Sequence, residues 1–152
     1  MCQTPDMQRP AVEPATEKLG YRLKRVASVL RARMDEGLRP HGLTVPQYAT
    51  LELLEDHPGL SNAELARGAF VTRQSMNVVL RGLQDSGLVH RPATSDHGRA
   101  LPAHLTDEGR RRLEAARDVV YALDRRMADA VPEERRADLR ADLDRMADAL
   151  GV

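Results

Sequence analysis

The feature that most constrains this chain is a pair of helix-start signals in close succession, at Ser61 and Thr72. In the segment SNAE, a serine stands three residues before Glu64, the spacing of a capping box. Gly68 ends the helix that Ser61 begins, so that helix must be short. The helix that begins at Thr72 runs to Gly87, a typical C-terminal breaker. The sequence therefore predicts a short helix, a turn and a second helix.

This second helix has two chemically different faces. Four apolar residues at helical spacing predict its buried side: Met76, Val79, Leu80 and Leu83. The remaining side carries hydrogen-bonding residues: Arg73, Gln74, Ser75, Asn77 and Arg81. Arginine pairs with guanine edges, and glutamine or asparagine pairs with adenine edges, in the DNA major groove. A solvated polar face on an ordinary helix would carry the same residue types, so the face alone leaves both interpretations open.

A predicted β-hairpin follows this helix. LVHRP (88–92) and RALPAHL (99–105) are two candidate strands around the turn ATSDHG, and Pro102 requires the second to be an edge strand. Near the tip, Arg99 follows Asp96 and Gly98, and Asp96 is placed to brace it by a charged hydrogen bond. An arginine at a hairpin tip suits the negative potential of a minor groove. The order helix–turn–helix–hairpin therefore favours DNA binding.

Amphipathic helices flank this central unit. A stripe of apolar residues predicts a first helix over residues 19–34. Two more stripes, over 113–130 and 139–150, predict long helices, of which one starts at Leu105 and Thr106 and the other opens at Pro132 in its first turn. Another helix begins at Thr44, where Gln47 completes a capping box and Tyr48, Leu51 and Leu54 form the apolar side. Proline-rich residues before the first helix predict a disordered arm.

Composition narrows the class of protein. Net charge is zero, because 23 Lys and Arg balance 23 Asp and Glu, although residues 61–105 carry a small positive excess and residues 106–152 a small negative one. Aromatic residues make up 3% with no Trp, which disfavours an aromatic platform for single-stranded nucleic acid. There is no signal-peptide pattern and no apolar run of membrane-spanning length, so we expect a cytoplasmic protein with no membrane partner.

The chain resembles the MarR family of winged-helix transcriptional regulators. The resemblance covers about residues 43–113 and rests on ordered motifs: LT..Q at 43–47, GLSxxELA at 59–66, VTRQSM at 71–76, GLV at 87–89, DxxRA at 96–100 and LTxxGR at 105–110. It implies a mainly α fold with a small β-hairpin wing, a winged helix-turn-helix flanked by long dimerisation helices. The corresponding division is an arm (1–15), an N-terminal dimerisation helix (16–40), a DNA-binding lobe (41–106) and C-terminal dimerisation helices (107–152).

The resemblance also implies a function and its residues. We expect a homodimeric DNA-binding regulator, a repressor, that binds a pseudo-palindrome in double-stranded DNA and is released by a small aromatic or phenolic ligand. Residues expected on base edges are Arg73, Gln74, Ser75 and Asn77, and Arg81 is expected to bind DNA from the same helix. Residues expected near phosphates are Ser61, Asn62 and Thr72, and Asp96, His97 and Arg99 are expected at the wing. Tyr21, His41 and Tyr48 are candidate lining residues of the ligand pocket.

Four other interpretations compete with this one. His90, His97 and His104 recur every seven residues. On a hairpin, His90 and His104 would face each other across the strands while His97 lies at the tip, so no metal or other cofactor is expected. Cys2 is a candidate redox thiol, yet nothing in the surrounding arm activates it. No GxSxG, HExxH or P-loop motif indicates an enzyme. A helical adaptor without DNA binding would explain the striped helices but leave the polar face and the wing unexplained.

Overall fold

The computed structural model describes residues 14–92 and 102–151. Its elements, in chain order, are α1 (Leu19–Leu38), the 3-10 helix η1 (Arg39–His41), α2 (Val45–Asp56), α3 (Asn62–Gly68), α4 (Arg73–Asp85), β1 (Val89–His90), β2 (His104–Leu105), α5 (Asp107–Asp129) and α6 (Glu133–Ala149). The predicted fold class is confirmed. Most of the predicted arm, including Cys2, and the wing residues Asp96, His97 and Arg99 lie outside the described residues.

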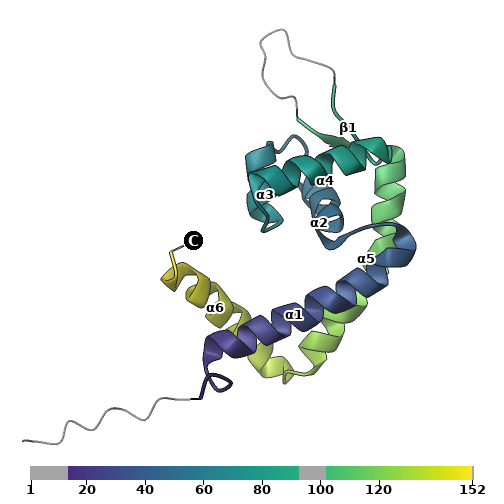
Figure 1. The fold of residues 1–152 in the computed structure, drawn as a ribbon. Coiled ribbons are helices and arrows are strands. Elements are labelled where there is room, and N and C mark those ends of the chain that lie inside the picture. The colour runs from purple at the N-terminus through teal and green to yellow at the C-terminus, as the bar shows by residue number, and fades with distance from the viewer. Residues whose placement is uncertain (1–13, 93–101, 152) are drawn as a thin grey trace, which may run out of the picture.

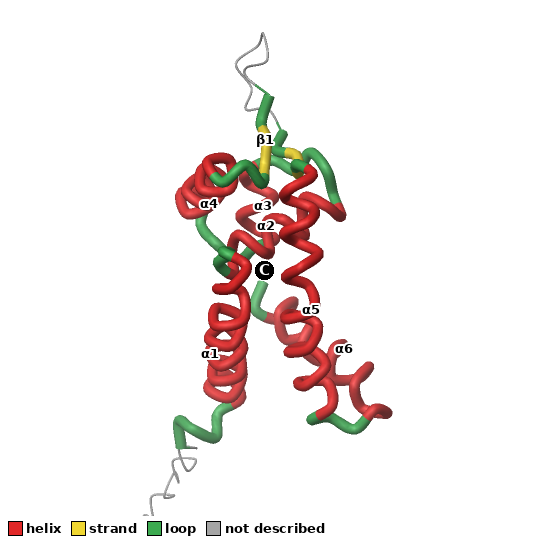
Figure 2. The backbone as a smooth tube through the Cα atoms, turned by 90° about the vertical axis from the view of Figure 1, so that its right-hand side faces the viewer, coloured by secondary structure: helices red, strands yellow, loops and turns green. Residues whose placement is uncertain are grey.

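The helices form a lobe and a stem. In Figure 1, α2, α3, α4 and the two strands gather at the top, whereas α1 and α5 extend below them. Figure 2 shows α1 and α5 as two diverging legs beneath the lobe, with α6 turning back from the lower end of α5. None of the helices in these ranges combines the length and hydrophobicity that crossing a membrane demands.

Side-chain caps fix where the lobe's helices begin. Thr44 and Gln47 form the predicted capping box of α2, and Ser61 and Glu64 form that of α3. Thr72 caps α4, as predicted, by accepting a hydrogen bond from the backbone N–H of Ser75. Each cap satisfies backbone donors that the first helical turn leaves without a partner. The starts of α3 and α4 are therefore set by local sequence.

Two predicted helix starts need correction. Leu105 belongs to β2, and Thr106 is the N-cap of α5 rather than a residue within it, because its side chain accepts from the backbone of Gly109. Pro132 is the N-cap of α6 and has an extended backbone, so it precedes the first turn instead of lying in it. The start of α5 shifts by two residues and the start of α6 by one, because in each case an N-cap residue precedes the first helical turn.

The hairpin is shorter than the sequence suggested. Each strand contains two residues, paired antiparallel as Val89 with Leu105 and His90 with His104. The predicted opposition of the two histidines is confirmed, with ring centroids 6.4 Å apart. Pro102 lies before β2 and outside the ladder, which differs from its predicted place inside the second strand. The edge-strand explanation for this proline is therefore unnecessary.

One hydrophobic core holds the lobe together and reaches into the stem. Leu51 and Leu54 of α2, Leu65 of α3, and Leu83 of α4 are buried at its centre. Leu88 and Leu105 extend the core beneath the hairpin, and Leu38, Leu113 and Ala116 join it from α1 and α5. Burial of this kind is the main stabilising term in folding. It fixes α4 on the lobe with one side facing outward.

Candidate nucleic-acid interface

The exposed side of α4 is the candidate interface. Met76, Leu80 and Leu83 face the core and are at most 1% exposed. The predicted reading residues all lie on the surface of the same helix: Arg73, Gln74, Ser75, Asn77 and Arg81. Within residues 14–92 and 102–151, neither Arg73 nor Arg81 forms an ion pair, so both guanidinium groups are available to an anion or a base edge.

The hydroxyl groups at the start of α4 are partly committed to the helix itself. The hydroxyl of Thr72 donates to the side-chain oxygen of Ser75 at 2.9 Å and accepts from the backbone N–H of Ser75 at 3.1 Å. The hydroxyl hydrogen of Ser75 remains free to donate. The backbone N–H groups of Arg73 and Gln74 in the first turn also remain, and such a helix start attracts phosphate. This end of α4 is therefore suited to a DNA backbone.

Asn62 joins the two helices of the motif. Its side-chain amide donates to Oδ1 of Asn77, which ties α3 to α4 across the turn. Its own Oδ1 is buried and has no hydrogen-bond partner among the described residues. The side-chain oxygen of Asn77 therefore already accepts a hydrogen bond. Asn77 is exposed, so its side-chain N–H groups are accessible from solvent. Asn77 is therefore placed to act as a hydrogen-bond donor, and Asn62 connects α3 to α4.

Ser61 is engaged in the same way. Its hydroxyl donates to the carboxylate of Glu64 at 2.6 Å and accepts from the backbone N–H of Glu64 at 3.3 Å. The hydrogen bond from the Ser61 side chain is the main reason that the pKa of Glu64 lies below its usual value, with a smaller contribution from the Ser61 backbone. The carboxylate is therefore charged beside a residue predicted to lie near a phosphate.

The three candidate pocket residues do not come together in one chain. Tyr21 lies near the start of α1 and His41 just beyond its end, and a helix of 20 residues is about 30 Å long. Tyr48 is 1% exposed, and its hydroxyl donates to Glu52 at 2.6 Å. Burial, followed by the hydrogen bond to Glu52, raises the pKa of Tyr48 well above its ordinary value. Of the three, His41 lines a groove.

That groove, which we term the His41 groove, lies between η1 and the first turns of α5. It has a volume of about 600 Å³, and its lining includes His41, Glu108, Arg111 and Arg112. Arg112 donates to the backbone oxygen of His41 at 3.0 Å and to Glu108 at 3.1 Å. Hydrogen bonds from Arg111, then from Arg112, lower the pKa of Glu108. An anion of the right shape would find two guanidinium groups there.

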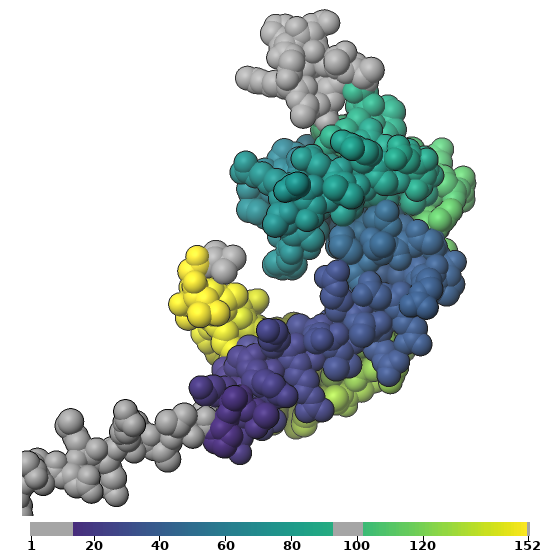
Figure 3. All heavy atoms as spheres, in the orientation of Figure 1, coloured from purple at the N-terminus to yellow at the C-terminus, as the bar shows by residue number. Residues whose placement is uncertain are grey.

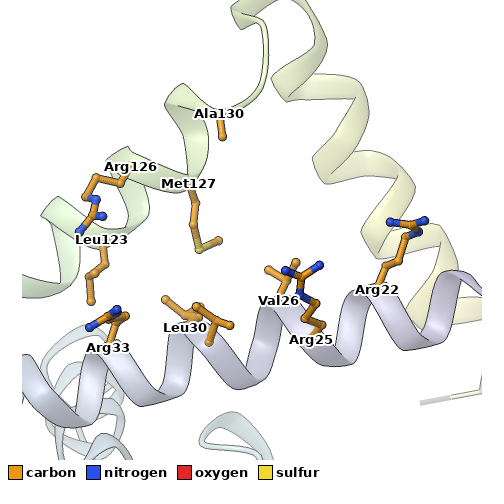
Figure 4. Close-up of a pocket in the computed structure, with 10 residues that line it drawn as sticks. Arg22, Arg25, Val26, Leu30, Arg33, Leu123, Arg126, Met127 and Ala130 are labelled. Carbon is orange, nitrogen blue, oxygen red and sulfur yellow. The ribbon is translucent and has the colours of Figure 1, made fainter. Parts of the chain in front are cut away.

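A second groove lies between the two legs of the stem. It has a volume of about 670 Å³ and is lined by α1 and α5. Figure 4 shows Val26 and Leu30 of α1 facing Leu123 and Met127 of α5, with arginines around them. The arginines are Arg22, Arg25, Arg33 and Arg126. We call this the stem groove. It is apolar at its centre and positively charged at its margins.

Two exposed apolar side chains on the lobe were not singled out by the sequence. Val78 of α4 is 68% exposed, and Phe70, in the turn before α4, is 93% exposed with φ of 55°. Val78 opens the apolar run VVL (78–80), so it resembles a core residue until its angular position on the helix is considered. The signal available in the sequence was that Val78 follows Gln74 by one helical turn and therefore lies on the polar side of the helix.

Comparison with known proteins decides the family. A family model described as the MarR family matches residues 41–100. The HTH-type transcriptional repressor Rv2887 of Mycobacterium tuberculosis is 52% identical over 109 residues, which cover 72% of this chain and 78% of the relative. The chain belongs to the MarR family. Its predicted identity as a winged-helix transcriptional regulator is therefore confirmed.

Solved structures of MarR proteins share this fold. The crystal structure of M. tuberculosis Rv2887 in complex with DNA has a TM-score of 0.67 and 43% sequence identity, covering 89% of this chain and 98% of that one. The same protein with salicylic acid has a TM-score of 0.64 and 46% identity, covering 88% and 96%. The repressor CouR bound to a 23-mer DNA duplex has a TM-score of 0.77 and 28% identity, covering 87% and 94%.

Proposed function

We propose that this MarR protein is a transcriptional repressor that binds a pseudo-palindromic operator as a homodimer and is released by a small aromatic ligand. The observation that carries the proposal is the outward face of α4, where exposed arginine, glutamine and asparagine side chains project from a helix anchored in the core. Rv2887 and CouR, which share the fold, have been crystallised with DNA. We assign the chain no catalytic step, and its place of action is the cytoplasm, with the DNA.

The proposed contacts divide by chemistry. Arg73, Gln74, Ser75, Asn77 and Arg81 meet base edges in the major groove; Ser61, Asn62 and Thr72 lie beside phosphates; Asp96, His97 and Arg99 act at the minor groove. Asn77 serves as a donor, because Asn62 occupies its oxygen. Of these side chains, arginine makes the most specific base contact, because its guanidinium group can donate to both O6 and N7 of guanine. Residues 41–106 make up the DNA-binding lobe.

The stem supplies the case for a homodimer. α6 has no buried residue in a single chain, yet Leu139 and Leu143 form an apolar stripe along it. Of the twelve exposed large hydrophobic residues in the described ranges, all but Phe70 and Val78 lie on α1, α5 or α6 and its C-cap. Figure 3 shows an open hollow between α6 and the lobe. A second copy would cover these faces, which makes residues 16–40 and 107–152 the dimerisation segments.

Charge favours the same assembly. The margins of the stem groove carry four arginines, whereas α6 carries six acidic and four basic residues. An α6 helix from a second copy would bring leucines to the apolar centre and carboxylates to the arginines. A two-fold dimer holds two α4 helices for two half-sites, about one DNA turn or 34–36 Å apart. A pseudo-palindrome matches that symmetry.

We place the effector in the His41 groove. Rv2887 has been crystallised with salicylic acid and with p-aminosalicylic acid, both small aromatic carboxylates. In this chain a carboxylate would compete with Glu108 for the guanidinium group of Arg111, which donates to Glu108 at 2.8 Å. The ligand releases DNA if it binds the released form more tightly than the DNA-bound form. Tyr21 and Tyr48 then play no part in the same groove.

DNA binding is tested by anisotropy with the duplex upstream of the chain's own gene and with sites selected from random DNA. Arg73→Ala is expected to cost about 1–3 kcal/mol, or roughly 5- to 150-fold in affinity. Arg110→Ala is the matched control, because Arg110 is exposed on α5 and pairs only with Asp107 in the described ranges. Selection of no sequence at all would favour the adaptor interpretation and contradict the proposal.

Effector release is tested with a second pair of variants. Arg111→Ala should raise the salicylate concentration needed for DNA release at least severalfold, compared with the same variant's DNA affinity measured without ligand. Arg110→Ala again serves as control, since each arginine pairs with an acid three residues earlier. Equal release in both variants would remove the His41 groove as the effector site. Release by an oxidant that Cys2→Ser abolishes would instead support a thiol switch.

A further inference from the structure

Val78 stands at the centre of the outward face of α4. Each helical residue turns by about 100°, so Gln74, Val78 and Arg81 fall on one side of the helix. Met76, Leu80 and Leu83 occupy the other side and are buried. Val78 is 68% exposed, and within α4 it is the one large hydrophobic side chain on the surface. An apolar group therefore lies between an amide and a guanidinium group on the proposed reading face.

Neither folding nor assembly explains a valine at this position. Valine is a poorer helix former than alanine, glutamine or arginine, and an exposed valine contributes little burial. The exposed apolar residues that we assign to the dimer lie on α1, α5 and α6, whereas Val78 lies on the lobe. Its neighbour Val79 is half-buried and packs against the core, so Val78 has no such role. The position of Val78 between Gln74 and Arg81, on the proposed reading face, favours a contact outside the chain.

We propose that Val78 is a specificity-determining residue that contacts the C5-methyl group of a thymine in each half-site. This inference rests on the proposed docking of α4 in the major groove. Thymine is the one base that presents a methyl group there. Valine offers two methyl groups and no donor or acceptor, so it excludes water from that methyl group and leaves the N4 amino group of a cytosine unpaired. Gln74 and Arg81 satisfy the polar base edges on either side.

The test removes the methyl group from the DNA and the side chain from the protein. The highest-affinity duplex from the random-DNA selection is prepared with deoxyuridine in place of one symmetric pair of thymines at a time. Deoxyuridine keeps the hydrogen-bonding groups of thymine and lacks only the methyl group. For one pair, the wild-type dimer should lose about fourfold in affinity per half-site, the ratio expected for exposing one methyl group to water.

Val78→Ala should lose a similar factor on the thymine duplex and show no further loss on the deoxyuridine duplex at that pair. The variant should fold, because the residue is exposed and alanine is a better helix former. Gln84→Ala, also exposed on α4, should keep the wild-type sensitivity to deoxyuridine. The substituted pairs elsewhere in the site provide a second control within the DNA.

The outcomes separate this inference from the proposed function. If a sequence is enriched but no thymine methyl group matters, or if Val78→Ala keeps the full sensitivity to deoxyuridine, Val78 does not read thymine and the DNA-binding role stands. If no sequence is enriched, both fail together. Val78→Ala could instead lose the same factor in affinity on every duplex, with its sensitivity to deoxyuridine unchanged. Val78 would then contact DNA without recognising a base, which would also overturn the inference.

Discussion

Gly109 marks the point where the stem is fastened to the wing, and replacing it by alanine tests that junction. A Cβ atom at this position would lie 2.1 Å from the carbonyl oxygen of Leu88 and 3.1 Å from its carbonyl carbon. Leu88 directly precedes β1, and its oxygen accepts a hydrogen bond from the backbone of Thr106 at 3.1 Å. The hydroxyl of Thr106 accepts from Gly109 at 3.0 Å and donates to Gly87 at 2.7 Å. The first turn of α5 and the start of β1 are thus in direct backbone contact.

The cost of Gly109→Ala follows from this geometry. Ordinary van der Waals contact for a Cβ begins near 3.4 Å, so α5 and β1 must separate by more than 1 Å. No rotamer change relieves the clash, because the obstacle is backbone. Overpacking of this kind costs about 1–3 kcal/mol, and the better helix propensity of alanine returns about 0.5–1 kcal/mol. A net loss of about 1–2 kcal/mol corresponds to a melting temperature lower by roughly 2–8 °C.

Gly20→Ala is the matched control for this prediction. Gly20 is also a helical glycine, but a Cβ there meets nothing within 4 Å. Its replacement should stabilise the protein by about 0.4–1 kcal/mol. Thermal unfolding followed by circular dichroism, at one protein concentration because a dimer's stability depends on it, gives both values. If Gly109→Ala melts at or above the wild type, the close packing of α5 on β1 is wrong.

Three further predictions concern the lobe. Thr72→Ala should lower the free energy of unfolding in urea by about 1 kcal/mol through loss of the α4 cap, and an unchanged midpoint would contradict the capping geometry. In a double-mutant cycle, Glu55 and Arg117, which pair α2 with α5, should show a coupling of about 0.5–3 kcal/mol; additive losses would refute the pairing. Because the raised pKa of Tyr48 favours its neutral form, its contribution to stability is present below the ordinary tyrosine pKa and is lost as pH rises above it. Ultraviolet absorbance should therefore show phenolate at Tyr48 only as the helical signal disappears, and Tyr48→Phe should remove that step; titration of all three tyrosines in folded protein would refute it.

Local chemistry made the order of elements in the lobe predictable. A capping threonine or serine acts on a backbone group two or three residues away, so Thr44, Ser61 and Thr72 could be assigned without knowing the tertiary fold. The polar and apolar sides of α4 follow from the angular spacing of its residues. Those rules involve only neighbours in the chain. They were sufficient to place Arg73 and Arg81 on the surface and Leu80 and Leu83 in the core.

Contacts between distant residues were not predictable in the same way. The pairing of Asn62 with Asn77 depends on how α3 crosses α4, and no local pattern encodes it. The candidate pocket of Tyr21, His41 and Tyr48 assumed that residues near a junction share a cavity, whereas the length of α1 keeps Tyr21 from His41. The sequence analysis did not identify Arg111 and Arg112 as candidate ligand-binding residues. They line the same groove as His41 only once the chain has folded.

The first two turns of α5 connect the proposed effector site with the wing. On one side, Thr106 and Gly109 hold the residues that lead into β1. On another, Arg112 holds the backbone of His41 and shares Glu108 with Arg111. A carboxylate that displaces Glu108 would therefore act on the same turn of helix that positions the hairpin. Since interfaces between packed elements switch between discrete arrangements instead of deforming smoothly, we expect a shift of that turn to move β1 and β2 relative to α4.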